Sequence, residues 1–480
     1  MSANKGSPTQ LWSCTATELT ALYRSNSASP VEAITQILDR IDQLNPIINA
    51  YCLVDRPAAL LAAKASEARW KAGLPLSEID GVPTSIKDLI LTSGWPTLRG
   101  SNTVNADQVW DIDAPCVARL KEAGAVLLGK TTTPEFGCKG ETNSPRLASI
   151  MTGNTRNPWN LNKTPGGSSG GAAAAIAASL GPLAMGTDGA GSVRIPAAFC
   201  GNFGLKPSFG RVPAYPLSPF GSVAHLGPHT LSVSDAAHMM NVISKPDARD
   251  WTSLAPSSTG FPTDYTAQLF DGIKGWRIAY SPTLGYVTNV DPEVAQAVDD
   301  AVKVLQSLGA HVDLIDPGFT SPFDISAGLW FAGSATLWAG LSNEQRALCD
   351  PDFVAQAEIG NRLSMLDVQQ LNMRRGQLGS HMRQFMLDYD LLITPTVSIP
   401  AFDARPAGST PFNAEEFLAW TPFSYPFNLT QQPAATIPCG RTRDGLPIGL
   451  QLVGRMFEDH RVLQAARAYE QTRPIDRAPL

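Results

Sequence analysis

The 480-residue sequence lacks the features of several large functional classes. It contains no long basic run and its formal net charge is −6, so it has no electrostatic pattern of a nucleic-acid-binding protein. Its N-terminal residues are polar and include no apolar signal segment. The longest nearly apolar run, residues 172–186, is interrupted by Gly and Pro and is too short to cross a bilayer. We therefore expect a cytoplasmic protein with neither nucleic-acid nor membrane partners.

Cysteine and histidine are also sparse and form no metal-binding pattern. The seven cysteines are scattered, odd in number and never arranged as CxxC, which disfavours a disulfide framework or a zinc site. The six histidines include no HExxH motif. The sequence thus predicts no metal and no cofactor, and it assigns Cys200 to a buried, unreactive position.

Helix and strand patterns alternate along most of the chain. After Pro30, apolar residues recur at intervals of three and four, as in an amphipathic helix. Residues 81–90 then show the short, apolar, β-branched pattern of a buried strand. Further predicted elements are helices at 57–72, 117–124, 294–309 and 459–472 and strands at 125–130, 276–282, 390–396 and 448–454. The alternation predicts an α/β fold, and without a linker or repeat we expect a single domain over 1–480 that begins with a helical segment at about 12–72.

The segment TPGGSSGG, residues 164–171, places two serines between two glycine pairs and allows three interpretations. A phosphate-binding loop requires a lysine directly after the last glycine, but Ala172 occupies that position. A hydrolase nucleophile elbow requires GxSxG between a strand and a helix; residues 166–170 match the letters, but no strand pattern precedes them. A glycine-rich entrance to the following helix, with the serines as caps, explains the segment when it is taken alone.

Three other motifs accompany this segment. They are DGVPTSIKDLI (80–90), GTDGAGSVRIPAAFCGNFGLKPSFGRVP (186–213) and FNLTQQPAATIPCG…GLPIGLQLVG (427–454). In their order and spacing the four motifs resemble the amidase signature family, over almost the whole chain from about residue 11. The resemblance implies an α/β/α sandwich with a mixed central sheet flanked by helices, and a signature core at about 80–215. It also implies a cofactor-independent hydrolase that cleaves the C–N bond of amides.

By the same resemblance, the catalytic residues are Lys87, Ser168 and Ser192. Ser192 is then the nucleophile, Ser168, on a cis peptide bond, is the bridging serine, and Lys87 is the base. Ser169 supports the turn. A serine hydroxyl is a weak nucleophile until a base takes its proton, and lysine is a base only when neutral. Since about one unperturbed lysine in two to three thousand is neutral at pH 7, burial in the apolar strand around Lys87 is needed to lower its pKa.

The resemblance further assigns an oxyanion hole and part of the substrate site. The hole is formed by backbone N–H groups of Gly189, Ala190, Gly191 and Ser192. The family usually has glycine where this chain has Ala190, whose methyl group is compatible with a negative φ. Asp188 and Arg194 are expected to brace this loop, and Thr142 and Asn143 to lie beside the acyl group.

Three segments expected to be loops, 210–230, 320–345 and 405–430, are rich in aromatic residues. These residues are Phe220, Trp330, Phe331, Trp338, Phe412, Phe417, Trp420, Phe423, Tyr425 and Phe427. Many aromatic residues belong to cores, but such loops favour a broad apolar pocket. We therefore expect small hydrophobic or aryl amides as substrates, with carbamates (urethanes) and esters as further substrates. The alternative is the glutamine-hydrolysing A subunit of a tRNA-dependent amidotransferase; the oligomeric state, a homodimer included, stays open.

Overall fold

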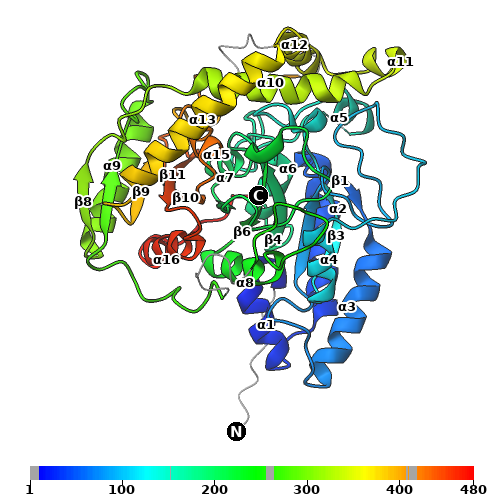
Figure 1. Cartoon of the computed structure of the whole chain (residues 1–480). Helices are drawn as coiled ribbons and strands as arrows, with labels where there is room; N and C mark the ends of the chain where they lie inside the picture. Colours follow the sequence, from blue (N-terminus) through cyan, green and yellow to red (C-terminus); the bar gives the residue numbers. More distant parts are fainter. Residues whose placement is uncertain (1–9, 152, 256–263, 407–408, 410–418) are drawn as a thin grey trace.

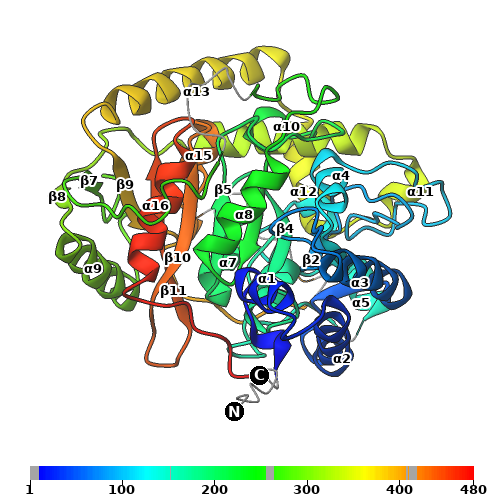
Figure 2. The same cartoon turned by 90° about the horizontal axis from the view of Figure 1, so that it is seen from below.

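The computed structural model describes residues 10–151, 153–255, 264–406, 409 and 419–480. Its strands form one large sheet (Figures 1 and 2), in the order β1-β3-β2-β4-β6-β5-β10-β11-β9-β7-β8. The strands are β1 (Tyr51–Val54), β2 (Pro83–Lys87), β3 (Val126–Thr131), β4 (Leu183–Asp188), β5 (Phe203–Lys206), β6 (His225–Thr230), β7 (Arg277–Tyr280), β8 (His311–Leu314), β9 (Leu391–Pro395), β10 (Ala434–Arg441) and β11 (Pro447–Gly454).

The sheet is mixed, as predicted. β2 runs parallel to its neighbours β3 and β4, and β7 runs parallel to β8 and β9. Between these two parallel groups, the strands from β4 through β6, β5, β10 and β11 to β9 pair antiparallel. The carboxyl ends of β2 and β4 therefore meet at the same edge of the sheet, where the motif 80–90 ends and the motif 186–213 begins.

Helices cover both faces of the sheet. They are α1 (Ala16–Arg24), α2 (Pro30–Ile48), α3 (Arg56–Lys71), α4 (Pro115–Glu122), α5 (Pro145–Ile150), α6 (Gly170–Ala177), α7 (Arg194–Cys200), α8 (Val233–Ile243), α9 (Pro292–Ser307), α10 (Phe323–Ala339), α11 (Asn343–Arg346), α12 (Pro351–Gly360), α13 (Met365–Phe385), α15 (Pro426–Leu429) and α16 (Asp459–Glu470). Within the described ranges, none of them is long and apolar enough to cross a membrane.

The side chains of β3 show how the sheet separates two cores. Leu127 packs into the core formed with α4, α8, α9 and α16. Its neighbours Val126 and Leu128 point to the opposite face and pack with α2, α3 and α6, because successive side chains of a strand alternate between the faces. At the other end of the sheet, α13 contributes Leu378 and Met382 to a third core. In Figure 1 this helix lies across the outside of the molecule. The α/β sandwich predicted from the sequence is confirmed.

The start of α2 illustrates how local sequence sets these elements. The Ser29 side chain accepts a hydrogen bond from the backbone N–H of Glu32, and the Glu32 carboxylate accepts one from the N–H of Ser29. This reciprocal arrangement satisfies two backbone donors that a helix start leaves free. Pro30 occupies the first turn, where its missing N–H costs nothing.

The prediction of a loop at 320–345 was wrong. Residues 323–339 form helix α10, which packs against α12 and α13. The segment is apolar on nearly every side, so it shows no helical period in the sequence. Residues 225–230, at the end of another expected loop, form β6. Phe412 and Phe417 lie outside the described residues.

Candidate active site

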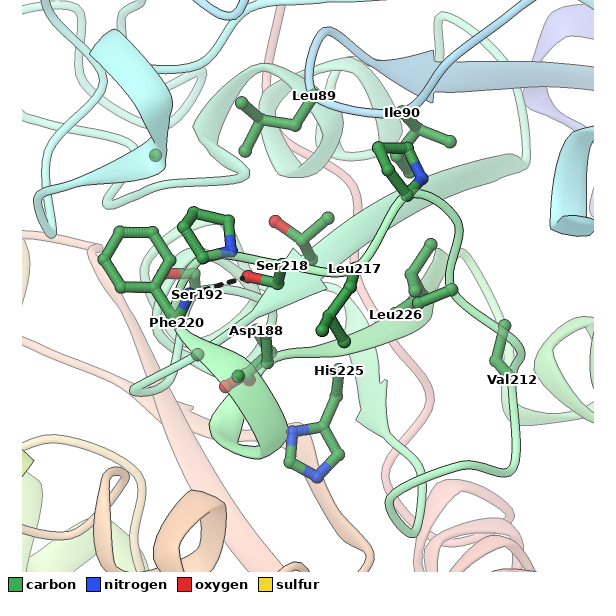
Figure 3. A pocket seen from close by; sticks show the side chains of 18 of the residues that line it. Leu89, Ile90, Asp188, Ser192, Val212, Leu217, Ser218, Phe220, His225 and Leu226 are labelled. Atoms are coloured by element: carbon green, nitrogen blue, oxygen red, sulfur yellow. Dashed lines mark hydrogen bonds between the residues drawn. The ribbon is translucent and has the colours of Figure 1, made fainter. Parts of the chain in front are cut away.

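A cavity of about 180 Å³ lies beyond the carboxyl ends of β2 and β4. Its walls are largely apolar. In Figure 3, Leu89 and Ile90, from the loop after β2, stand on one side, and Leu217 and Phe220 on the other. Ser192, from the loop after β4, lies in the same wall as Phe220 in this view. Ligand sites at the carboxyl ends of parallel strands are common in α/β folds, because the loops there are free to carry side chains.

Lys87, the last residue of β2, is fully buried next to this cavity. Its Nζ atom hydrogen-bonds Ser168 Oγ at 2.8 Å, Ser169 Oγ at 2.8 Å and Thr187 Oγ1 at 2.7 Å. Burial lowers the pKa of Lys87 well below its usual value, and the attraction of Asp188 opposes this only in part. Among the described residues, no carboxylate lies within 4 Å of Nζ. The lysine is thus placed to act as a neutral amine.

The two adjacent serines of the glycine-rich segment have different surroundings. Ser168 follows a cis peptide bond from Gly167, and it lines the cavity together with Ser192. Ser169 does not line the cavity; its Oγ accepts from the N–H of Thr187 and donates to the Thr187 carbonyl. The backbone N–H of Ser169 also donates to the carbonyl of Ser192 at 3.1 Å. These contacts bring Lys87 and both serine loops together, and they give Ser169 the supporting position expected for it.

The loop that carries Ser192 is held by a buried ion pair. Asp188 and Arg194 are both fully buried, with Arg194 Nε 3.0 Å from Asp188 Oδ2. Arg194 Nη1 also donates to Gln451 Oε1 at 2.7 Å, and Asn428 Nδ2 donates to Asp188 Oδ1 at 2.9 Å. With its partners satisfied on every side, the pair braces the loop and leaves neither charge for a substrate.

One expected donor of the oxyanion hole, the N–H of Gly191, belongs to the same hydrogen-bond network. The N–H of Gly191 donates to Asp188 Oδ1 at 2.7 Å, so it is already occupied. In the described part of the chain, no protein group accepts a hydrogen bond from the N–H of Gly189, Ala190 or Ser192. Three of the four expected donors therefore stay available for a developing negative charge.

Ala190 and Gly191 are not interchangeable. Ala190 does not have a positive φ, and its methyl group packs in an apolar cluster with Trp330 and Tyr425. Gly191 has a φ of 123°, and a Cβ atom there would lie 2.5 Å from Ser424 Oγ. The loop thus accepts a methyl group at the first position and requires glycine at the second.

Thr142 and Asn143, expected beside the acyl group, do not line the cavity. The Thr142 hydroxyl donates to the carbonyl of Gly166 at 2.8 Å, and Asn143 Nδ2 donates to Glu141 Oε2 at 2.9 Å. Both residues are buried. Thr142 packs behind the glycine-rich segment because the missing side chain of Gly170 leaves room for it. Thr142 thus supports the glycine-rich segment from behind, and Asn143 is held by Glu141 and by the carbonyl of Arg405.

Of the aromatic residues singled out in the sequence, Phe220 and Trp330 line the cavity. Their rings stack with centroids 4.0 Å apart and 14° between their planes. The other described members of the set belong to hydrophobic clusters, with Tyr425 and Phe331 next to Trp330. Sequence reasoning missed Thr187, whose contact with Lys87 is set by the pairing of β2 with β4.

Comparisons with known proteins show which family the chain is similar to. Residues 32–463 match the family described as Amidase. An acylamidase of Rhodococcus erythropolis is 38% identical over 472 residues, which cover 97% of this chain and 96% of the relative. The A subunit of the glutamyl-tRNA(Gln) amidotransferase of Myxococcus xanthus (strain DK1622) is 36% identical over 98% of this chain and 100% of its own length. The solved structure of a bacterial aryl acylamidase superposes with a TM-score of 0.87 at 31% identity, covering 96% of each chain.

Proposed function

The chain belongs to the amidase family, and we propose that within this family it is a solitary serine hydrolase of small hydrophobic or aryl amides. Its catalytic residues in this proposal are Lys87, Ser168 and Ser192. One observation carries it: a buried lysine with a lowered pKa lies 2.8 Å from Ser168 Oγ, beside a largely apolar cavity that also contains Ser192.

Two steps lead to an acyl-enzyme, and the first of them forms a tetrahedral intermediate on Ser192. Ser192 Oγ attacks the carbonyl carbon of the amide while its proton passes to Ser168, and Ser168 gives its own proton to the neutral amine of Lys87. The carbonyl oxygen becomes negatively charged in the tetrahedral intermediate. The backbone N–H groups of Gly189, Ala190 and Ser192 are placed to stabilise that charge.

The second step releases the amine. When the C–N bond breaks, the ammonium of Lys87 returns its proton through Ser168 to the leaving nitrogen, since an unprotonated amide anion leaves very poorly. Water then attacks the acyl-enzyme by the same relay and regenerates the Ser192 hydroxyl. A carbamate presents the same carbonyl and follows the same steps, so we include carbamates among the substrates.

The charges in the cavity wall favour this function over that of a glutamine-hydrolysing amidotransferase component. Glutamine carries an α-ammonium group, which needs an acidic partner. Two acidic residues are found among the described lining residues, Asp188 and Asp250. Asp188 pairs with Arg194, and Asp250 accepts hydrogen bonds from the Ala214 N–H and the Thr252 hydroxyl at 2.8 and 2.6 Å. Asp188 is thus neutralised by Arg194, and Asp250 is already hydrogen-bonded within the protein, which makes both weaker sites for an ammonium group than an unengaged carboxylate.

The experiment is aniline release by the purified single chain from an N-aryl acylamide and from the matching N-aryl carbamate, with glutamine as a third substrate. We expect turnover of the acylamide without a partner or ATP, and none after Ser192→Ala. The rate ratio of the first two substrates then ranks amide against carbamate cleavage. Turnover of glutamine alone would instead support the amidotransferase alternative.

Mass spectrometry of the trapped acyl-enzyme supplies a sharper control. Ser218 lines the same cavity as Ser192, and its hydroxyl accepts the N–H of Phe220 at 3.2 Å (dashed line in Figure 3). The acyl adduct should persist in Ser218→Ala and disappear in Ser192→Ala. An adduct that survives in Ser192→Ala would contradict the assignment of the nucleophile.

A further inference from the structure

Arg99 lies between two cavities. One is the cavity that contains Ser168 and Ser192, called the reaction cavity from here on. Together with Phe136 and Leu337, Arg99 lines both of them. The second cavity has a volume of about 560 Å³, and it is also lined by Val109, whose side chain is 81% exposed. The second cavity therefore reaches the surface, and Arg99 lies where the apolar reaction cavity borders a more solvated space.

The backbone holds Arg99 in one direction. Its φ of 56° lies in the left-handed region, which is uncommon for a residue other than glycine. The N–H of Arg99 donates to the carbonyl of Asp88 at 3.0 Å, and the N–H of Phe136 donates to the carbonyl of Arg99 at 2.8 Å. The loop after β2, which carries Arg99, is also anchored by Lys130, whose Nζ donates to the Ile90 carbonyl at 2.6 Å. The backbone at this position is thus fixed, and it presents the side chain to the cavities.

The guanidinium group has no partner among the described residues: it makes no hydrogen bond there and has no carboxylate within 4 Å. Burial lowers the pKa of Arg99, and only the attraction of Asp88 opposes this. The Asp88 carboxylate is itself engaged, since it accepts the N–H of Leu98 at 3.2 Å and lies 3.7 Å from Lys130 Nζ. A partly buried charge without a partner is costly, and a bound anion would remove that cost.

We propose that Arg99 is an anion-binding subsite of this amidase, and that its preferred substrates carry a carboxylate in addition to the amide bond. This inference rests on the proposed function. A guanidinium group matches a carboxylate with two parallel hydrogen bonds. Because Arg99 also borders the solvated second cavity, the ion pair is only partly desolvated, which favours net binding. Glutamine is a poorer match, because the two acidic residues among the described lining residues, Asp188 and Asp250, are already engaged by protein groups.

Two pairs of anilides test the subsite. In the first pair the acyl group carries the charge: N-phenylsuccinamate against N-phenylpentanamide. In the second the amine carries it: 4-acetamidobenzoate against 4-acetamidotoluene. We expect the wild-type kcat/KM to be higher for the carboxylate in at least one pair, and that pair identifies the side of the amide that faces Arg99.

Arg99→Gln should lower kcat/KM for the preferred carboxylate by about 10- to 100-fold, the loss expected for a charge-assisted hydrogen bond. Its neutral partner should change by less than about threefold, because uniform effects on folding or chemistry act on both substrates alike. Arg99→Lys, which keeps the charge and loses the planar fork, should recover part of the preference. Added salt should reduce the preference in the wild type, which gives a reading that needs no variant.

Equal losses for the charged and neutral substrates in Arg99→Gln would overturn the subsite, as would the absence of a carboxylate preference in both pairs. In those cases turnover of the neutral anilides would leave the proposed amidase function standing. Failure of the wild type to hydrolyse any of the four anilides would overturn the proposed function itself.

Discussion

Lys87 and Lys139 are both buried lysines, but their Nζ atoms meet opposite kinds of partner. Lys87 contacts three hydroxyl groups, and burial lowers its pKa well below the usual value against the attraction of Asp188. Lys139 lies 2.8 Å from both Asp350 and Asp352. Burial acts on its pKa in the same direction, but the two carboxylates outweigh burial and raise it. The comparison teaches that the partners, more than the burial, decide whether a buried lysine is a base or a structural cation.

Lys130 lies between these two extremes. It is fully buried on β3, and the nearest carboxylate oxygen, of Asp88, is 3.7 Å from its Nζ atom. Burial lowers its pKa against the attraction of that single carboxylate. Its hydrogen bonds go to the Ile90 carbonyl and the Thr97 hydroxyl, so it fastens the loop after β2. Lys87 alone of the three adjoins a serine that lines the reaction cavity.

The largest expected effect is at Lys87 itself. Lys87→Met removes the proposed base, and kcat should fall by about 10⁴-fold or more, as when one member of a catalytic triad is deleted. Methionine fills a similar volume, so the circular dichroism spectrum should match that of the wild type. Anilide hydrolysis measured beside that spectrum checks both points. Retention of more than a few per cent of the activity by the folded variant would contradict the role of Lys87.

The matching change in the other region should alter stability instead. Lys139→Met leaves Asp350 and Asp352 buried without their main cation, and we expect a loss of about 3 kcal/mol in the free energy of unfolding. Urea denaturation measures this loss. The molecules that remain folded should still hydrolyse the anilide, because Lys139 does not line the reaction cavity. A stable but inactive Lys139→Met would break the distinction between the two lysines.

Thr187→Asp should give Lys87 a carboxylate partner, as Lys139 has in Asp350 and Asp352. Its carboxylate would stand where Thr187 Oγ1 now accepts from Lys87 Nζ at 2.7 Å. A nearby opposite charge raises the pKa of Lys87 by about two units, which lowers kcat/KM about 100-fold at pH values below that pKa. The acidic limb of the pH–rate profile should move to higher pH by the same amount.

Thr187→Asn is the matched control for that prediction, since it has the same shape without the charge. It should keep the acidic limb near the wild-type position. If the asparagine and aspartate variants had equal profiles, charge at this position would not govern Lys87.

The smallest effect is expected at Ala190. Ala190→Gly removes a methyl group that is 9% exposed and packs on Trp330 and Tyr425. We expect a loss of about 1 kcal/mol in stability from the packing and the added backbone freedom. The proposed oxyanion donor is the backbone N–H, which is unchanged, so kcat should stay within about threefold. A large loss of kcat would show that the methyl group positions the substrate.

The sequence predicted the parts of the fold and site that depend on local patterns. The apolar strand around Lys87 and the helix that begins at Pro30 are readable because neighbouring residues determine them. The motifs also identified both serine loops. Helix α10 escaped prediction because a segment that is apolar on every side has no period to detect.

Other features depend on residues far apart in the chain. The N–H of Gly191 is occupied only because Arg194 and Asn428 hold Asp188 against it. Arg99 reaches the cavity through a left-handed backbone that Lys130 helps to fix. No pattern in the sequence encodes such tertiary contacts, so the occupied donor and the cationic wall residue could be found only in the structure.

The pH dependence of kcat/KM for the wild-type enzyme on a neutral anilide tests the central claim most directly, because it reports the pKa of the essential base in the free enzyme. In the proposed mechanism the neutral form of Lys87 is the active one. The rise of kcat/KM with pH should therefore have its midpoint well below 10.5, the ordinary pKa of lysine, and level off above that midpoint. A profile that keeps rising until about pH 10.5 would mean that Lys87 is charged near neutrality, as Lys139 is, and would contradict the account.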